Sequence, residues 1–472
     1  MKNRERRPGS LANRAWLPPA SQALIDQSSS WTAQASRADI DQRIHALVRG
    51  NNEIHNRDCI NLNPATNTMN PRAEALLAQG LGTRPSLGYP GDKYEMGLEA
   101  IEQIEIITAE LAAEVFGARY VELRVPSGAI ANLMAFMSLT SAGDAIVVPP
   151  PAVGGHVTHH NAGVAGLYGL RIHQAPVDAV DYTIDVDALG QLAATVRPKV
   201  ITIGQSLNLF HHSVSKIREV ADKFGAIVLF DAAHLSGLIA GGSWPNPLDE
   251  GAHLVTMSTY KSLGGPPSGL ILTNEPAIAE RLESVAFPGL TANFDVSKTA
   301  ALALTLLDWQ QFGPQYSEEM VSAARHLAIA LHRLGLPVVA AGRGGTLSHA
   351  FALDASNLGG GTNLARRLRA ANLLTSAIGL PTGEDDGLRI GTNELVRLGA
   401  QGSDIDELST LIASAISDDP KNTAPAVSTL RRRLTNLKFV AGRPGTTTSL
   451  GKPAKEVAQS QNVTSITDSR ND

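Results

Sequence analysis

In Val228-Leu-Phe-Asp231-Ala-Ala-His234, a short apolar run ends in a lone carboxylate. In Val255-Thr-Met-Ser258-Thr-Tyr-Lys261, a second apolar run leads to a lone lysine, thirty residues after the aspartate. Short, continuous apolar runs of this kind are typical of strands that are buried on both faces of a sheet. The pattern therefore predicts two buried strands, each delivering one charged side chain at its end.

A carboxylate and a lysine delivered in this way are what pyridoxal phosphate chemistry requires. The lysine amine forms a Schiff base with the cofactor, and the carboxylate keeps the pyridine nitrogen protonated so that the ring accepts electrons. A surface lysine and an ordinary strand-end aspartate would give the same local pattern. The rest of the sequence favours Lys261 and Asp231 as a cofactor-binding pair.

Short apolar runs alternate with helical segments around these two strands. The predicted strands are 145–148, 199–203, 226–230, 254–257 and 269–272. A helix predicted over 214–224 separates two of them, and a longer helix is predicted over 96–116, closed by Gly117. Such alternation predicts an α/β fold whose central sheet is mostly parallel.

Length and texture divide the chain into four parts. Its 472 residues exceed the usual size of a single hydrophobic core. The predicted parts are an N-terminal arm (1–55), a large domain (56–295), a smaller C-terminal α+β domain (296–417) and a largely disordered tail (418–472). The small domain is predicted from amphipathic helices at 296–312, 318–334, 364–371 and 404–416.

Composition excludes several classes of function. A net charge of −5 argues against a nucleic-acid partner or an anionic membrane surface, and no apolar run reaches membrane-spanning length. The single cysteine, Cys59, excludes a disulfide within one chain and fits a cytoplasmic location. The grouped histidines lack carboxylate or cysteine ligands at useful spacing, so we expect no metal site.

A candidate phosphate site precedes a predicted helix over 130–137. Ser127-Gly128-Ala129 would present backbone N–H groups at the N-terminus of that helix, where an anion binds well. Serine is also among the commonest helix caps, which is the simpler interpretation. Ser258, three residues before Lys261, would add a hydroxyl to the same phosphate.

Three further side chains are candidates for the same site. His156 follows two glycines in a loop, where its ring could stack on a cofactor, although the local pattern by itself favours an ordinary loop histidine. His234, three residues after Asp231, would point into the same cleft. Arg389 lies in a short glycine-flanked strand, and a guanidinium is the natural bidentate partner for an amino acid's carboxylate. An exposed arginine on an edge strand is the alternative.

Taken together, these segments resemble serine hydroxymethyltransferase, a pyridoxal phosphate-dependent transferase of fold type I. The resemblance runs from about residue 60 to 416 and rests on segments that occur in the family's order: Gly88-Tyr-Pro-Gly91, Ser127-Gly128, Gly154-Gly-His156-Val-Thr-His159, Asp231–Ala240, Pro245-Asn-Pro247, the Lys261 segment, Phe287-Pro-Gly289 and Leu388–Thr392.

The resemblance implies a role for each candidate residue. Lys261 is the Schiff-base lysine, Asp231 partners the pyridine nitrogen and His156 stacks on the ring. Ser206 and His234 lie beside the cofactor, and Arg389 binds the substrate carboxylate. The resemblance also implies a homodimer whose active site is completed by the neighbouring subunit.

The sequence departs from the family where protons and substrate are handled. Leu87 stands where the family has a glutamate that manages protons in the folate-dependent step, and Pro85 replaces a tyrosine. Tyr94 keeps the first of two paired tyrosines, and Glu95 replaces the second. The other departures are Tyr260 for a histidine, Pro267 for an arginine, and Thr66-Asn67-Thr68 for Ser-Glu-Asn. We expect Tyr260 among the catalytic residues and Tyr94 and Thr66 among those that bind substrate.

The expected function is that of an enzyme acting on the Cα–Cβ bond of a small β-hydroxy amino acid. Pyridoxal phosphate is the expected cofactor, and Leu87 argues against the use of tetrahydrofolate. The altered positions leave open another pyridoxal phosphate reaction, such as racemisation or amino transfer. A non-catalytic protein that binds the cofactor is a third alternative, against which the retained Asp231 and Lys261 argue.

Overall fold

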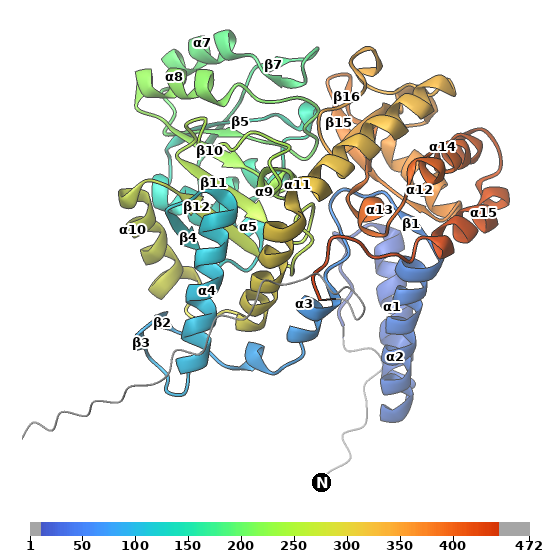
Figure 1. Ribbon diagram of the computed structural model, residues 1–472, viewed down its shortest axis with the longest axis horizontal. Helices are drawn as coiled ribbons and strands as arrows, with labels where there is room; N and C mark the ends of the chain where they lie inside the picture. The colour runs from blue at the N-terminus through green and yellow to red at the C-terminus, as the bar shows by residue number, and fades with distance from the viewer. Residues whose placement is uncertain (1–10, 443–472) are drawn as a thin grey trace, which may run out of the picture.

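The computed structural model describes residues 11–442 and is built around one seven-stranded sheet (Figure 1). Its strand order is β4-β12-β11-β10-β9-β5-β6. The strands are β4 (Tyr120–Glu122), β5 (Ala145–Val148), β6 (Arg171–Gln174), β9 (Val200–Ile203), β10 (Ile227–Asp231), β11 (Leu254–Ser258) and β12 (Gly269–Thr273). Only β12 runs against its two neighbours. The mostly parallel α/β fold is confirmed.

Helices cover both faces of this sheet. One face is packed by α5 (Gly128–Leu139), α6 (Val164–Leu167) and α10 (Pro276–Ser284). The other is packed by α4 (Glu99–Phe116), α7 (Val186–Val196), α8 (Val214–Phe224), α9 (Ser236–Ala240) and α11 (Val296–Arg333). Side chains along each strand alternate between these two cores, which explains the continuous apolar runs in the sequence.

The predicted strands in the large sheet agree with the structure to within about one residue at each end. Helix α8 has the predicted bounds, and α4 begins three residues later than predicted and ends at Gly117, whose φ is 62°. The prediction missed β4 and β6, which are the two edge strands. Their sequences mix charged and apolar residues because only part of an edge strand is buried.

One long helix replaces two predicted ones. The helices expected at 296–312 and 318–334 form the single helix α11, which has Pro314 inside it. A proline in a helix interior costs about 3 kcal/mol. Here α11 packs against α4 and α9 before the proline and against α14 (Gly402–Ser417) after it, so contacts on both sides hold the helix together. The prediction of two helices was wrong because these contacts keep the chain helical through Pro314.

The C-terminal part contains a three-stranded antiparallel sheet in the order β13-β16-β15. Its strands are β13 (Ala350–Asp354), β15 (Ser376–Leu380) and β16 (Gly383–Gly391), and its helices are α12 (Gly361–Ala370), α13 (Asn393–Arg397) and α14. A short strand, β1 (Ile60–Asn61), pairs in parallel with β14 (Leu373–Leu374). Residues 60–61, which were predicted in the large domain, therefore join the smaller one.

The predicted tail contains a helix. Residues Pro420–Arg433 form α15, which packs against α14 and buries Val427 and Leu430. The prediction of disorder from residue 418 was wrong for this stretch because its polar composition and two prolines hide a narrow apolar stripe. Pro420 occupies the first turn, where its missing N–H is harmless, and Asp419 caps the helix. The predicted disorder at 443–472 lies outside the described residues.

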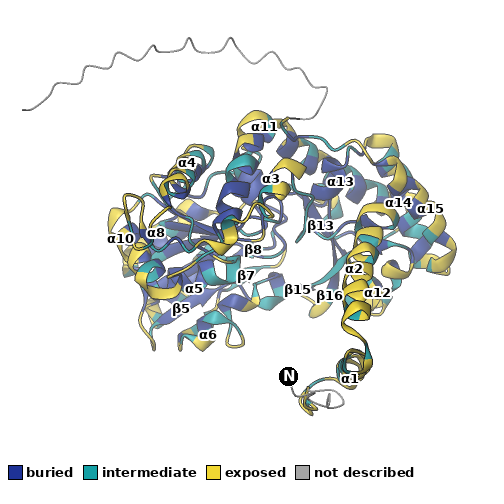
Figure 2. Ribbon diagram, turned by 90° about the horizontal axis from the view of Figure 1, so that it is seen from below, coloured by how far each residue is buried: buried dark blue, intermediate teal, exposed yellow. Residues whose placement is uncertain are grey.

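The N-terminal arm consists of two helices, α1 (Pro19–Gln34) and α2 (Arg37–Glu53). Neither contains a buried residue, and both project from the body of the molecule (Figures 1 and 2). Ser36 and Asp39 form a reciprocal capping box at the start of α2. None of the described helices is long and apolar enough to span a membrane.

The remaining short elements connect these parts. They are α3 (Pro71–Leu76), the hairpin β2 (Gly88–Tyr89) and β3 (Asp92–Lys93), and the hairpin β7 (Val177–Asp178) and β8 (Thr183–Ile184). The glycine- and proline-rich stretch 80–91 thus includes the first strand of the β2–β3 hairpin and its turn.

Candidate active site

The carboxyl ends of β10 and β11 bring three predicted site residues together. The two strands are parallel, with Asp231 in register with Thr256. Along both strands, alternate side chains face α5, and Asp231, Thr256 and Ser258 all lie on that face. Lys261 follows β11 by three residues and is 6% exposed. Open α/β sheets bind ligands at this edge.

Asp231 is held by two side chains that come from distant parts of the chain. Its Oδ2 atom accepts a hydrogen bond from Asn132 Nδ2 at 2.9 Å and lies 2.9 Å from His159 Nε2. Burial alone would raise the pKa of this carboxyl, but the hydrogen bond and charge of His159 outweigh burial and lower it. Asp231 therefore carries its negative charge throughout the physiological pH range.

Asn132 ties this carboxylate to the neighbouring strand and loop. Its amide oxygen accepts a hydrogen bond from Thr256 Oγ1 at 2.7 Å, and its nitrogen donates to Thr158 Oγ1 at 3.0 Å. Thr158 in turn lies 2.9 Å from Nδ1 of His156. Burial lowers the pKa of His156 to about 4, so its imidazole is neutral near pH 7. A neutral, oriented ring suits stacking.

The Lys261 amine contacts a second buried imidazole. Its Nζ atom lies 3.2 Å from Nε2 of His234. Burial lowers the pKa of Lys261 to about 8, against the opposing influence of Asp231. His234 is fixed from the other side because Ser262 Oγ donates to its carbonyl oxygen at 2.7 Å. A lysine whose pKa is brought close to neutrality has a reactive fraction of free amine.

Arg389 reaches the site from β16 of the smaller sheet. Its guanidinium donates to the Ser206 carbonyl oxygen at 2.5 Å and to Ser376 Oγ at 3.2 and 3.0 Å, and it lies 3.4 Å from His234 Nε2. It is 7% exposed, and burial lowers its pKa to about 10. Among residues 11–442, no carboxylate forms an ion pair with Arg389 or with Lys261. Buried cations are normally paired with anions. Arg389 and Lys261 therefore suit a ligand that carries negative charge.

The N-terminus of α5 faces the same cleft. Ser127 caps the helix by accepting from the Ile130 N–H at 3.3 Å, and the N–H groups of Gly128 and Ala129 have no intrahelical partner. A Cβ on Gly128 would lie 2.3 Å from Ser258 Oγ, so only glycine leaves this approach open. The simpler role of Ser127 as a cap is therefore present, together with free N–H donors for an anion.

These groups fit pyridoxal phosphate as a set. Free N–H donors and the Ser258 hydroxyl suit its phosphate, a permanently charged Asp231 suits its ring nitrogen, and the buried Lys261 amine suits its aldehyde. Arg389, which forms no ion pair within residues 11–442, suits a substrate carboxylate. A buried ring nitrogen of His234, Nδ1, also lacks a partner among the described residues, which fits a site that lacks its ligand.

Three other predicted residues form no hydrogen bond with this set in the described part of the chain. Tyr260 is half-buried, and its side chain has no hydrogen-bond partner in the described part of the chain. Thr66 Oγ1 accepts from Asn61, which also binds Glu394, so Thr66 belongs to the base of the small domain. Tyr94 is 80% exposed and directly follows the β2–β3 hairpin.

Sequence reasoning missed Asn132 and His159 as partners of Asp231, and Ser376 as a partner of Arg389. No local pattern marks Asn132, because it becomes important only when α5 crosses the ends of β10 and β11. His159 had a usable signal, since it lies three residues after His156.

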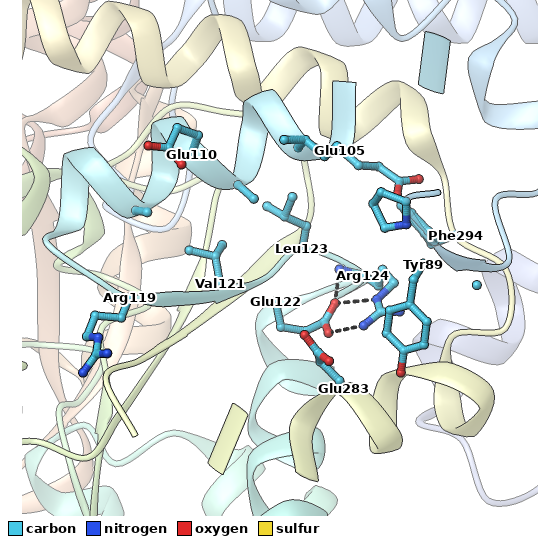
Figure 3. Close-up of a pocket in the computed structure, with 15 residues that line it drawn as sticks. Tyr89, Glu105, Glu110, Arg119, Val121, Glu122, Leu123, Arg124, Glu283 and Phe294 are labelled. Atoms are coloured by element: carbon cyan, nitrogen blue, oxygen red, sulfur yellow. Dashed lines mark hydrogen bonds and ion pairs between the residues drawn. The ribbon is translucent and has the colours of Figure 1, made fainter. Parts of the chain in front are cut away.

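A surface pocket lies beside the hairpin, between α4 and β4 (Figure 3). Arg124 lies there between Glu122, with which it forms an ion pair at 2.7 Å, and Tyr89, whose ring centre is 5.4 Å away. None of the residues gathered around Lys261 lines this pocket. It is thus separate from the candidate active site.

The chain is similar to known proteins of one enzyme family. The family model for serine hydroxymethyltransferase matches residues 38–412. Alpha-methylserine aldolase of Variovorax paradoxus is 55% identical over 437 residues, which cover 92% of this chain and 99% of that protein. Alpha-methylserine aldolase of a Ralstonia species is 51% identical, covering 91% and 100%. Serine hydroxymethyltransferase of Methanopyrus kandleri is 36% identical, covering 84% and 95%.

Proposed function

Because this chain belongs to the serine hydroxymethyltransferase family, and is thus a pyridoxal phosphate enzyme of fold type I, we propose that it cleaves the Cα–Cβ bond of α-methylserine without tetrahydrofolate. The observation that carries the proposal is Leu87. The chain keeps Asp231, Lys261 and Arg389, whereas Leu87 replaces the carboxylate that serves folate chemistry in the family. Relatives at 51–55% identity bear the name of this aldolase, which supports the choice of substrate.

The proposed reaction balances without a one-carbon carrier. In α-methylserine, Cα bears an amino group, a carboxylate, a methyl group and a hydroxymethyl group. Removal of the hydroxyl proton and cleavage of Cα–Cβ releases formaldehyde and leaves the electron pair of the broken bond on Cα. Protonation of Cα then gives alanine. Serine, which has hydrogen in place of the methyl group, would give glycine.

Each retained side chain has a part in this reaction. When bound, pyridoxal phosphate supplies an electron sink for the electron pair left on Cα. Asp231, held ionised by His159 and Asn132, would keep the ring nitrogen protonated. The N-terminus of α5 and Ser258 would hold the phosphate, and Arg389 would orient the substrate through its carboxylate.

The hydroxyl proton needs a base, and Leu87 cannot be that base. Three neutral or partly neutral nitrogens are available in the site. Burial lowers the pKa of His156 and of His234 below the usual value for an imidazole, and it lowers the pKa of Lys261 to about 8. A released aldehyde requires only this proton transfer, whereas delivery of the carbon to folate would need further acid–base groups.

The substrate proposal is tested by incubating the purified holoenzyme with α-methylserine and, separately, with serine. We expect α-methylserine to give alanine and formaldehyde in equal amounts, and at a higher kcat/KM than serine gives glycine. Alanine without formaldehyde would indicate a different reaction and would contradict the proposal. Racemisation of alanine alone would point to the alternative chemistry.

Arg389→Lys should raise KM for the amino acid strongly, with a smaller change in kcat. A lysine is a point charge and cannot form two parallel hydrogen bonds to a carboxylate. Loss of one charge-assisted hydrogen bond costs about 1.5–3 kcal/mol, which corresponds to roughly 10- to 150-fold. Steady-state kinetics check this, with Arg366→Lys on the exposed face of α12 as the matched control. Equal reactivity of amines that lack a carboxylate would exclude the role of Arg389.

The enzyme is expected to be a homodimer. Tyr94 and Met96 after the hairpin, and Ile106 and Ile107 on α4, are large apolar side chains that are all more than half exposed at the molecular surface, and Ile106 also lines the pocket of Figure 3. Such a surface suits contact with a second copy, which would receive the hairpin near its active site. The charge introduced by Ile107→Glu should weaken the dimer at least about tenfold because it would be buried without a partner.

Sedimentation equilibrium measures this dimer directly. Leu334→Glu, which alters an exposed leucine at the end of α11, is the control and should leave the dimer intact. A fully active monomer under assay conditions would contradict the expected assembly.

A further inference from the structure

The segment Leu437–Ala441, here called the C-terminal strap, leaves α15 and returns across the middle of α11 (Figure 1). Its backbone is bonded at three points. Lys438 donates its N–H to the Arg397 carbonyl at 2.8 Å, Arg397 Nη1 donates to the Phe439 carbonyl at 2.7 Å, and Ala441 donates its N–H to Asp308 Oδ1 at 2.7 Å. Phe439 has a φ of 60°, a conformation that persists only where the surroundings impose it.

The strap covers a buried pair of charges. Arg397 and Asp308 are 1% and 2% exposed at the side chain, and their nearest charged atoms are 4.0 Å apart. Asn70 donates to both oxygens of Asp308, at 3.1 and 3.0 Å, and Arg397 Nε donates to the Thr68 carbonyl at 3.2 Å. The strap adds one hydrogen bond to the side chain of each member of the pair. A buried charge that loses its hydrogen bonds is strongly unfavourable. The position of the strap is therefore well determined.

The Phe439 ring connects the strap to Tyr316 on α11. The two rings stack with centroids 4.8 Å apart and an interplanar angle of 15°. The Tyr316 hydroxyl donates to the Asn393 carbonyl at 2.8 Å and accepts from Asn67 Nδ2 at 3.0 Å. Asn67 Nδ2 also lies 3.4 Å from the Ser262 carbonyl oxygen. Contacts thus run from the strap to the residue that follows Lys261.

A second set of contacts leads from Tyr316 through Trp309 to Leu263, the next residue of the same loop. Trp309 lies one turn of α11 before Gly313, packs against Tyr316 at 5.2 Å and donates its indole N–H to the Leu263 carbonyl at 2.7 Å. Gly264, whose φ is +68°, approaches Asn67 so closely that an added Cβ would lie 3.0 Å from its nitrogen. The loop 262–264 therefore rests on Asn67 and Trp309, and both contact Tyr316.

This loop sets the place of the reactive amine. Ser262 Oγ bonds the His234 carbonyl and accepts from the Gly237 N–H at 3.0 Å. His234 is the residue that contacts the Lys261 amine. Two backbone hydrogen bonds, Gly264 to Lys261 at 3.0 Å and Gly265 to Thr259 at 2.8 Å, close the loop around the lysine. A shift of the loop would move both Lys261 and His234.

We propose that the C-terminal strap is a positioning element for Lys261, and that Phe439 acts through Tyr316, Asn67 and Trp309 to hold the loop 262–264. This inference rests on the proposed cofactor role of Lys261. Phe439 does not touch the cofactor or the substrate, and it is a positioning residue. The segment that follows α15 thereby helps to hold the active-site loop in place.

The test compares Phe439→Ala with Phe224→Ala, which removes a ring at the C-terminal end of α8, a helix that packs against α7 and β10. Hydrogen exchange is measured on the full-length protein without cofactor, and the dissociation constant of pyridoxal phosphate is measured by fluorescence. We expect Phe439→Ala to speed exchange of the Gly264 and Gly265 amides and to raise the dissociation constant, each by about tenfold. Phe439→Tyr keeps the ring and should restore both values.

Phe224→Ala should leave both values unchanged even where it lowers the thermal midpoint as much. If Phe439→Ala does not accumulate as folded protein, Phe439→Leu, which keeps apolar burial and loses the stacked ring, is measured instead. Normal exchange and normal affinity in the folded variant, or equal changes in Phe224→Ala, would overturn the proposal. Hydrogen exchange in the cofactor-free protein measures the stability of the loop 262–264 and does not depend on the role of Lys261. A wrong assignment of Lys261 would be detected separately, as attachment of the cofactor to another lysine.

Discussion

Replacing Lys261 with alanine should abolish covalent attachment of the cofactor and reduce turnover by at least about 10³-fold, a loss within the range observed for groups that take part directly in proton transfer. Its amine is buried, lies 3.2 Å from His234 and has a pKa lowered to about 8. Alanine leaves no amine at this position. Borohydride reduction of the holoenzyme followed by peptide mass spectrometry measures the attachment directly.

Lys199→Ala is the matched control, because that lysine lies exposed just before β9. The control should retain the reducible attachment and normal turnover. Attachment to a lysine other than Lys261, or persistence of the reducible adduct in Lys261→Ala, would show that the site is organised around a different residue.

Asp231→Asn should remove most of the activity and leave the fold intact. An amide has nearly the same shape and can still bond Asn132 or His159, but it has no charge to hold a proton on the ring nitrogen. Removal of one preorganised charge or donor typically costs about 10²–10³-fold in kcat. Turnover of α-methylserine, with circular dichroism as a check on folding, measures the effect.

Asp222→Asn is the control for this variant, since Asp222 pairs with Arg218 on the surface of α8. Surface ion pairs contribute little, so activity should be unchanged. Near-normal turnover in Asp231→Asn would mean that another group partners the ring nitrogen.

The parts of the site that sequence alone could predict are those written in short segments. Asp231, Ser258 and Lys261 follow directly from two apolar runs, because each strand end carries its own functional group. The Ser127-Gly128 turn is similarly local, and the structure places it against Ser258. Arg389 was found through its strand and the family resemblance, and β16 brings it within 3.4 Å of His234.

The parts that could not be predicted depend on contacts between distant segments. Asn132 meets Asp231 across 99 residues of sequence, and β1 pairs with β14 across more than 300. Helix α11 continues through Pro314 only because other helices hold both of its halves. No periodicity in the sequence marks the strap, whose contacts with Asp308 and Arg397 are mostly made through its backbone. A contribution of Tyr94 to a neighbouring subunit likewise leaves no pattern in the sequence, because it depends on a contact between two chains.

The proposed folate independence rests on Leu87, which stands where the family has a glutamate. Leu87 is half-buried just before β2, where its carbonyl accepts from the Tyr94 N–H at 3.2 Å. A leucine neither donates nor accepts a proton. Leu87→Glu restores the family's carboxylate and is the matched gain-of-function variant, whereas Leu87→Met keeps the position apolar and serves as its control.

The central claim is tested most directly by the initial rate of formaldehyde release from α-methylserine, measured on the wild-type holoenzyme with and without tetrahydrofolate. We expect the same rate in both conditions, and serine cleavage that tetrahydrofolate does not accelerate unless Leu87 is changed to glutamate. A wild-type rate that depends strongly on tetrahydrofolate, or failure to release formaldehyde from α-methylserine at all, would contradict the account.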